Sequence, residues 1–216
     1  MIHLRNFLPF LFVIVHSLAF AQIKANISAQ NYELQSVDLL VEDVFVKINQ
    51  DGEISGFQTG YFDGEVDYYD DANFDAYRFG KLKKIGHLKI DYWDTLDKSD
   101  LKYGKIKNIG TVEIEYYDSF EREKSGKVKK IGNLQIDYWD RDVIDNSRLG
   151  KLKSIDHLRI DYGLKDIIDS SKYRKLIKFG SVDLEYWNDK VFDKEKYGKL
   201  KLIKGNTKDV SVNLVW

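Results

Sequence analysis

The chain contains no cysteine, a single proline and a single methionine. Without cysteine, neither a disulfide framework nor a thiolate metal site can support the fold. The one proline, Pro9, lies near the N-terminus, so every later residue can donate its backbone amide to a sheet. Histidine is also rare, with 4 residues, and this scarcity argues against a zinc site or a nucleophile–histidine catalytic pair.

The chain also lacks an excess of either positive or negative charge. The chain has 34 Lys and Arg against 35 Asp and Glu, for a net charge of −1. Such a balance argues against nucleic acid or an anionic membrane surface as the main partner. We found no glycine-rich phosphate loop and therefore expect no cofactor. Aromatic residues make up 14% of the chain, which is too many for a disordered tail.

Long apolar runs are absent except near the N-terminus. The first residues carry Arg5 and no acid, continue through an apolar run at 7–15 and end in Ala19-Phe20-Ala21. This pattern is typical of a secretory signal peptide and is too short for a spanning helix. We therefore predict that residues 1–21 are removed. The remainder is expected to be exported through the Sec pathway, without a membrane span, to the periplasm, the cell surface or the medium.

A repeat of about 24 residues, a period typical of tandem arrays, fills most of the remaining chain. The phrase GKLKKIGHLKIDYWD at 80–94 returns almost unchanged as GKVKKIGNLQIDYWD at 126–140. After each Ile-Gly step, apolar and polar residues alternate strictly, as in Leu88, Ile90 and Tyr92. Period-two alternation rich in Ile, Val and aromatic residues predicts β-strands.

The repeat predicts an all-β fold, and we favour an elongated, twisted, antiparallel meander of β-hairpins. Polar tetrads such as 97–100 and 145–148 follow an apolar residue in each linker and have the chemistry of turns. Length changes fall at the Ile-Gly step, where a hairpin tip absorbs them easily. The alternative, a parallel β-solenoid with stacked apolar columns, stays open.

The predicted organisation is a signal peptide at 1–21, an N-terminal lead-in segment at 22–43 and a β-repeat domain at 44–216. The last contains about seven hairpin units, including a degenerate first unit at 53–70 and one further hairpin upstream of it near residues 44–54. Residues 210–216 are expected to form a closing edge strand. The sequence does not decide between a single-layered sheet and one that curls over itself.

A two-residue turn at Gly86-His87 would place Ile85 opposite Leu88. Continued to the end of the hairpin, this register places Gly80 opposite Trp93, where an aromatic ring can cover the bare glycine.

The pattern G-K-x-K-x-I-G-x-x-x-I-D-Y-[WY]-D resembles the tandem repeats of uncharacterised exported proteins of Bacteroidota. The resemblance extends over about residues 80–203 and is clear at Ile131-Gly132, at 136–138 and at Asp140. Gly163 departs from it, because it interrupts the aromatic column. The resemblance implies an envelope or secreted β-repeat protein and supplies no catalytic residues.

Acidic residues recur at one position of the repeat, which is the wrong distribution for an active site. A catalytic centre is singular, whereas an acid that returns in unit after unit is better explained by cross-strand pairing with the equally regular lysines. We therefore predict no catalytic residue and no metal ligand. The acids of this column are Asp91, Glu115, Asp137, Asp161 and Glu185.

Aromatic residues form a second column, one residue beyond the repeated tyrosines. A row of planar rings on a solvated sheet suits sugar rings or extended glycans, although the rings would serve packing alone if they cover the glycines or lie inside a curled sheet. The predicted ligand-binding residues are Trp93, Tyr117, Trp139 and Trp187.

These features predict a non-enzymatic exported protein that acts as a binding or structural module of the cell envelope or extracellular space. Its expected partner is a polysaccharide or another envelope component. Two alternatives remain: a glycan hydrolase that uses a pair of carboxylates, and a purely structural spacer.

Overall fold

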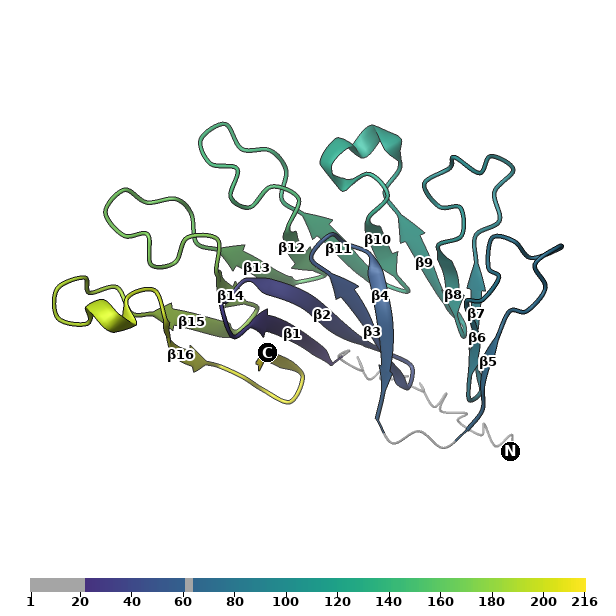
Figure 1. Ribbon diagram of the computed structural model, residues 1–216, viewed down its shortest axis with the longest axis horizontal. Coiled ribbons are helices and arrows are strands. Elements are labelled where there is room, and N and C mark those ends of the chain that lie inside the picture. Colours follow the sequence, from purple (N-terminus) through teal and green to yellow (C-terminus); the bar gives the residue numbers. More distant parts are fainter. Residues whose placement is uncertain (1–21, 61–63) are drawn as a thin grey trace, which may run out of the picture.

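The computed structural model describes residues 22–60 and 64–216. The predicted signal peptide, 1–21, lies outside the described residues. Within them the protein is all-β, with a 12-stranded sheet and a 5-stranded sheet (Figure 1). No helix in these described ranges is long and apolar enough to cross a membrane.

The 12-stranded sheet, called here the long sheet, is an antiparallel meander in which each strand pairs with the next in the chain. This confirms the predicted hairpin meander and excludes the solenoid. The linkers on one side hold two short 3-10 helices, η1 (Ser119–Lys124) and η2 (Lys194–Lys196). The strands are β5 (Val66–Tyr68), β6 (Leu82–Ile85), β7 (Leu88–Tyr92), β8 (Ile106–Ile109), β9 (Val112–Tyr116), β10 (Val128–Ile131), β11 (Leu134–Tyr138), β12 (Leu152–Ile155), β13 (Leu158–Tyr162), β14 (Leu176–Phe179), β15 (Val182–Tyr186) and β16 (Leu200–Lys204).

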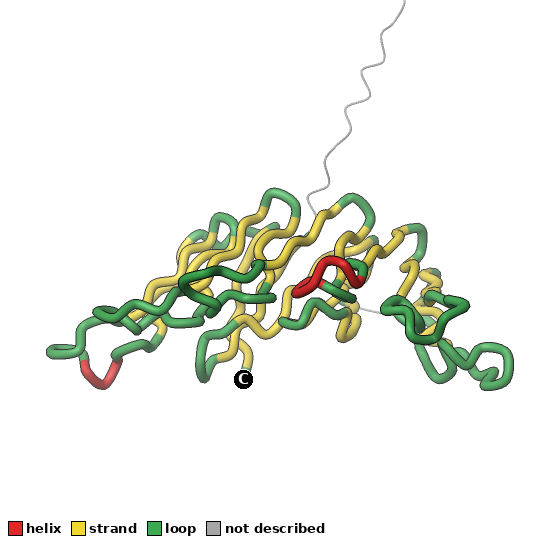
Figure 2. The backbone as a smooth tube through the Cα atoms, turned by 90° about the horizontal axis from the view of Figure 1, so that it is seen from above, coloured by secondary structure: helices red, strands yellow, loops and turns green. Residues whose placement is uncertain are grey.

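The Ile-Gly step is the tight turn of most hairpins, with Asp156 in place of the glycine in the β12–β13 turn and Phe179 in place of the isoleucine in the β14–β15 turn. Gly86 has a φ of 57°, a left-handed conformation that glycine adopts without steric cost. Ile85 pairs with Leu88 and Lys84 with Lys89, so the predicted register at the turn is correct. Short turns lie along one side of the strands and long linkers along the other (Figure 2).

The predicted pairing of Gly80 with Trp93 is wrong. Trp93 instead donates its backbone amide to Lys105 O at 2.8 Å and accepts from Gly104 N at 2.8 Å. The reason is that β6 and β7 pair only next to their turn, while β7 stays paired with β8 beyond a bulge between Asp91 and Tyr92. Each aromatic therefore lies opposite the glycine of the following unit.

A second sheet covers one face of the long sheet (Figure 1). The predicted lead-in segment, 22–43, contributes its first two strands, and the expected hairpin near 44–54 contributes the next two. The C-terminal strand is an edge strand, as predicted, but it belongs to this sheet and runs parallel to β1. The strand order is β17 (Val210–Val215), β1 (Ile23–Ser28), β2 (Leu34–Val41), β3 (Val44–Asn49) and β4 (Ile54–Thr59).

The core lies between the two sheets. Ile90, Ile136 and Ile160 of the long sheet are at most 1% exposed, as are Val37 and Leu39 of the 5-stranded sheet. Backbone hydrogen bonds also cross between the layers, for example from Val128 N to Gly52 O at 2.8 Å. The repeated Ile and Tyr columns are therefore buried by a second layer and not by curling of the long sheet on itself.

Candidate functional site

The predicted ligand-binding residues Trp93, Tyr117, Trp139 and Trp187, called here the aromatic row, each follow directly after a strand of the long sheet. Tyr117 is 9% exposed, and its ring lies 6.0 Å from that of Tyr138 in the core. The three tryptophans are half-buried. Trp93 and Trp139 pack partly against the core, and their indole nitrogens are buried without a hydrogen-bond partner among the described residues.

Two cationic side chains flank each ring of the aromatic row. One comes from the linker, two residues before the repeat glycine, and the other from the strand that follows. Such contacts stabilise rings and cations together, and they occupy ring faces that a sugar would need for stacking. The cation-to-centroid distances are, for Trp93, Lys102 (5.4 Å) and Lys107 (4.9 Å); for Tyr117, Lys124 (5.7 Å) and Lys129 (5.2 Å); for Trp139, Arg148 (3.8 Å) and Lys153 (5.7 Å); for Trp187, Lys196 (4.5 Å) and Lys201 (5.0 Å).

The unit that lacks an aromatic ring supports a packing role for the lysine of the following strand. Gly163 replaces the ring there, and the strand position that elsewhere holds the flanking lysine is Ile177. The ring and the strand lysine are therefore lost together, while the linker cation remains as Lys172. This fits a packing role for the strand lysine in the units that keep the ring.

Four of the five repeated acids, all except Glu185, are paired with bases in the described part of the chain, as expected for structural carboxylates. Asp137 accepts from Lys124 at 2.7 Å and from Lys153 at 2.9 Å. Burial alone would raise the pKa of Asp137, but these two hydrogen bonds outweigh it and lower the pKa. Arg78 and Asp91 meet at 2.8 Å, and Arg148 and Asp161 meet at 2.9 Å.

Lysines that follow the repeat glycines link neighbouring units through the interior. Lys81 Nζ lies 5.2 Å from the ring centroid of Tyr92 and donates to Gly104 O of the next unit at 2.6 Å. Burial lowers the pKa of these lysines, here called the bridging lysines. They and the carbonyl groups that accept from them are Lys81 to Gly104, Lys105 to Gly126, Lys127 to Gly150, Lys151 to Arg174 and Lys175 to Gly198.

Large apolar side chains project from the long linkers into solvent. Phe120 is 90% exposed, and its backbone amide donates to Asp118 Oδ1 at 2.9 Å, which fixes the turn. These side chains contribute no packing to the core. The equivalent residues, all at least 85% exposed, are Phe74, Leu96, Phe120, Ile144, Ile168 and Phe192.

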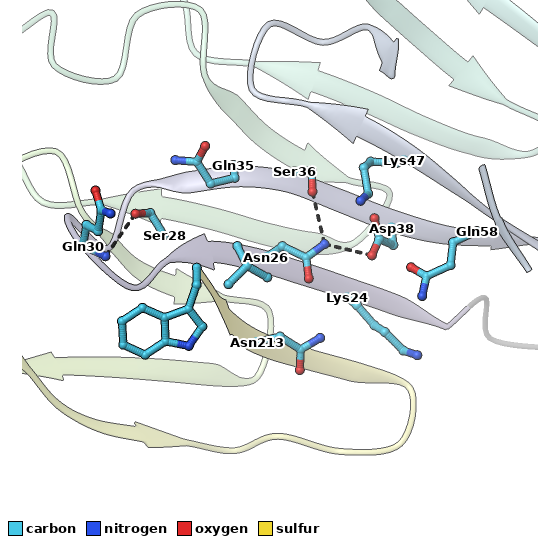
Figure 3. A pocket seen from close by; sticks show the side chains of 12 residues that line it. Lys24, Asn26, Ser28, Gln30, Gln35, Ser36, Asp38, Lys47, Gln58 and Asn213 are labelled. Atoms are coloured by element: carbon cyan, nitrogen blue, oxygen red, sulfur yellow. Dashed lines mark hydrogen bonds between the residues drawn. The ribbon is translucent and has the colours of Figure 1, made fainter. Parts of the chain in front are cut away.

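The sequence did not predict a polar hollow of about 600 Å³ on the outer face of the 5-stranded sheet (Figure 3). Amide and hydroxyl groups dominate this polar hollow. It is lined by Lys24, Asn26, Ser28, Gln30, Gln35, Ser36, Asp38, Lys47, Gln58, Asn213, Val215 and Trp216.

Asp38 lies at the centre of the polar hollow and is 5% exposed. Its Oδ2 accepts from Asn26 Nδ2 at 2.8 Å, and the same amide donates to Ser36 Oγ at 3.1 Å. Asp38 Oδ1 is buried and has no hydrogen-bond partner in the described part of the chain. A buried carboxylate oxygen of this kind usually has a donor. Lys24 and Lys47 lie directly across from Asp38 on the two neighbouring strands, and the other sources of a donor are water and a ligand.

The rim of the polar hollow carries the groups that contact solvent. Lys24 Nζ lies 4.2 Å from the ring centroid of Phe45 at one end. Trp216 is 101% exposed, so its ring is free for contact. A carboxylate oxygen without a hydrogen-bond donor, several amide groups and a solvent-exposed indole ring together suit a polar, hydroxylated ligand.

Strand alternation is the signal that would have located the polar hollow. Residues 23–28 alternate apolar Ile23, Ala25 and Ile27 with polar Lys24 and Asn26. The 5-stranded sheet buries the apolar set and turns the polar set outward. Recognition of 22–43 as strands, and not as a lead-in, would have placed these polar residues on one face.

A metal centre is not indicated in the described ranges, which contain no group of three or more His, Asp or Glu side chains suited to an ion. Asp38 is the one carboxylate among the hollow's described lining residues. Compared with known protein families, curated proteins and solved structures, the chain gives no significant match.

Proposed function

We propose that the protein is a non-enzymatic, exported binding module of the cell envelope or extracellular space, and that its polar hollow holds a saccharide. The observation that carries this proposal is Asp38, a carboxylate in the hollow with one hydrogen-bonded oxygen and one buried oxygen that lacks a donor. Sugar hydroxyl groups supply donors and also accept from amides, so they match both halves of this lining.

The rim supports a saccharide over a small polar ion. The exposed ring of Trp216 offers an apolar face to the carbon-bound hydrogens of a sugar, while Asn26 and Ser36 line the same hollow with polar groups. Two lysines, Lys24 and Lys47, also line the hollow. They suit a sugar that carries a carboxylate, so neutral and acidic saccharides both belong in the test.

Binding is favoured over hydrolysis because glycosidases use two carboxyl groups flanking the scissile bond. Asp38 has no second carboxylate beside it among the described lining residues. Four of the five repeated acids are engaged with lysine or arginine, as Asp161 is with Arg148, and Glu185 makes no ion pair among the described residues. The rival hydrolase would need to release reducing ends from a glycan that the protein binds.

The earlier expectation of glycan contact at the aromatic row stays a prediction and is tested in the same experiment. The flanking cations support a packing role for Trp93, Trp139 and Trp187. A spacer function, the third possibility, would leave both surfaces without ligand.

The test is a screen of neutral and acidic oligosaccharides by calorimetry, followed by variants. We expect Asp38→Asn, which keeps the shape and removes the acceptor charge, to weaken binding about tenfold or more, since hydrogen bonds to charged groups contribute about 1.5–3 kcal/mol. Trp216→Ala should weaken binding without changing the fold, because that ring is fully exposed. The matched control is Asp91→Asn, whose carboxylate lies on the long sheet.

Three outcomes contradict the proposal. Absence of binding across the screen indicates that water or a neighbouring lysine satisfies Asp38. Binding that survives Asp38→Asn and Trp216→Ala but disappears when Trp93, Trp139 and Trp187 are replaced by Ala moves the site to the aromatic row. Release of reducing ends during incubation shows an enzyme.

A further inference from the structure

We infer that the long sheet continues from one copy of the protein to the next, with β16 of one copy pairing antiparallel with β5 of a second copy. This goes beyond saccharide binding and does not depend on it. The two strands are the opposite edges of the 12-stranded sheet. An edge strand presents unpaired backbone groups that can accept a further strand.

The repeat makes the two edges complementary. Inside the sheet each unit joins a first strand to a second one through the Ile-Gly turn, as β6 joins β7. β16 is a first strand whose chain leaves for β17, and β5 is a second strand without a first strand before it. Residues 199–203, KLKLI, match KLKKI at 81–85, and residues 66–70, VDYYD, match IDYWD at 90–94. Each edge therefore carries the sequence of the other edge's missing partner.

The β5 edge exposes apolar side chains whose counterparts inside the sheet are buried, and the β16 edge exposes an apolar residue, Leu202, where inner units have polar ones such as Lys84. Val66 and Tyr68 of β5 are 46% and 54% exposed, whereas the equivalent Ile90 and Tyr92 are 1% and 7% exposed. At the other edge Leu202 is 44% exposed. A second copy placed at either edge would remove this apolar surface from water.

Two hydrogen bonds recur in the inner units, and at each edge of the long sheet only the donor or only the acceptor of such a bond is present. Tyr92 donates its hydroxyl to Leu82 O at 2.8 Å, and Lys81 covers the Tyr92 ring and donates to Gly104 O. The counterparts Tyr68 and Lys199 make no side-chain hydrogen bond within the described residues. In the joined sheet, Tyr68 of one copy donates to Leu200 O of the other.

Lys199 completes the same arrangement from the opposite side. It lies over the ring of Tyr68 in the second copy and donates to the carbonyl of Gly80 there, as Lys81 does with Tyr92 and Gly104. The joint therefore extends the row of bridging lysines without a break.

Charge also favours this partner over others. Residues 199–204, KLKLIK, contain three lysines and no acid, while residues 64–71, GEVDYYDD, contain four acids and no base. Opposite charges across an interface steer association and disfavour pairing of like edges. The contact is head-to-tail, so every assembly retains one free β5 edge and one free β16 edge, and further copies can be added.

The inner register gives the contacting residues. Because Lys84 pairs with Lys89 and Ile85 with Leu88, Leu202 should lie opposite Glu65, and Ile203 opposite Gly64. The chain contains no cysteine, so a pair of introduced thiols reports this register without background. Within one copy the two positions lie at opposite edges of the sheet and cannot form a disulfide with each other.

The first experiment oxidises the Glu65→Cys, Leu202→Cys double variant and separates it on a non-reducing gel. We expect a ladder of dimers, trimers and longer chains. The matched control, Glu65→Cys with Ile203→Cys, should give no ladder, because Ile203 pairs with the buried Leu184 on the inner face, opposite to the face that Leu202 occupies. Equal ladders from both variants, or none from the first, would overturn the inference.

The second experiment measures mass by sedimentation velocity over a range of protein and salt concentrations. We expect the mass of the unmodified protein to rise with protein concentration and to fall with salt, which screens the complementary edges. Val66→Lys and Leu202→Glu should each weaken self-association about tenfold or more. Both residues are substantially exposed, so circular dichroism should show an unchanged fold.

Mixing the two edge variants distinguishes head-to-tail pairing from other association. Val66→Lys blocks the β5 edge and Leu202→Glu blocks the β16 edge, so each variant keeps one intact edge. The mixture should form dimers and nothing larger. A purely monomeric mixture, or an unmodified protein whose mass stays monomeric at every concentration, would overturn the inference.

Discussion

At the scale of single residues, the repeated tyrosines occupy the same position in each unit but do not all make the same hydrogen bond. Tyr92, Tyr116, Tyr138 and Tyr186 each donate a hydroxyl to a backbone carbonyl of the neighbouring strand. Tyr162 occupies the same column and is 1% exposed, yet its hydroxyl has no partner among the described residues. The same side chain is thus satisfied in some units and unsatisfied in another.

This difference predicts opposite responses to removal of the hydroxyl. Tyr138→Phe should destabilise the fold by about 1 kcal/mol, because Val128 O loses its 2.9 Å hydrogen bond inside the core. Tyr162→Phe should be neutral or stabilising, because it removes a buried polar group that makes no bond. Urea unfolding of the two variants measures the difference. A larger loss for Tyr162→Phe would contradict this account.

The sequence correctly predicted which residues lie opposite each other where the pairing depends only on a nearby turn. Ile85 and Leu88 meet across a two-residue turn, so local turn geometry was enough to pair them. Trp93 failed because its partner depends on a bulge and on a linker that returns to the next unit. Asp38 was missed because a lone acid between Val37 and Leu39 carries no spacing motif.

At the scale of the repeat unit, the glycine that begins each copy has two separate roles. Gly104 has a φ of 70°, and a Cβ built on it would lie 2.8 Å from Lys81 Nζ and 2.9 Å from Tyr77 O. Gly80 has a similar φ of 73°, but a Cβ there would meet nothing within 4 Å. Both positions need a left-handed residue, and only Gly104 must also leave room for a bridging lysine.

Alanine at these two glycines therefore separates backbone strain from crowding. Gly80→Ala should cost about 1–2 kcal/mol from the left-handed conformation alone. Gly104→Ala should cost more, because the backbone carbonyl of Tyr77 cannot move away as a side chain can. Equilibrium unfolding in urea measures both values, and equal losses would show that crowding by Lys81 and Tyr77 is unimportant.

The hairpin units were predictable from the sequence because each of them repeats the same alternation of apolar and polar residues and the same turn. Their organisation into a meander followed from the linker chemistry, and the structure confirms it. The 5-stranded sheet was not predicted, since its strands come from opposite ends of the chain and β1 pairs with β17 only through long-range contact. Alternation in 22–43 signals strands, but not the layer to which they belong.

At the scale of the whole molecule, the interior is lined by tyrosines and bridging lysines, and both respond to alkaline pH. Burial raises the pKa of Tyr92 to about 12 and raises the pKa of Tyr116 and Tyr186 as well. Burial lowers the pKa of the lysines below 10.5, as for Lys81. The two groups therefore act on stability in opposite directions.

We expect the free energy of unfolding to rise with pH as the buried lysines lose their protons, up to their ordinary pKa of 10.5. Above pH 10 the unfolded chain loses tyrosine protons that the folded chain retains, so stability should fall. Each tyrosine contributes a slope of at most about 1.4 kcal/mol per pH unit.

Urea unfolding at a series of pH values between neutrality and the alkaline limit measures this profile. Tyrosinate absorbance recorded in parallel should show that the buried tyrosines ionise together with loss of structure. Stability that stays flat as the pH passes from 10 to 12 would contradict the burial of the tyrosine column.

The parallel pair of β1 and β17 also sets an order of events during synthesis. Ile23 pairs with Val210, so β1 must keep one edge open until β17 has been produced. Every hairpin of the long sheet can form earlier, from local contacts. A nascent chain that stops before Val210 therefore displays an unpaired strand beside an unfinished apolar layer, the kind of feature by which chaperones and quality-control proteases detect incomplete products.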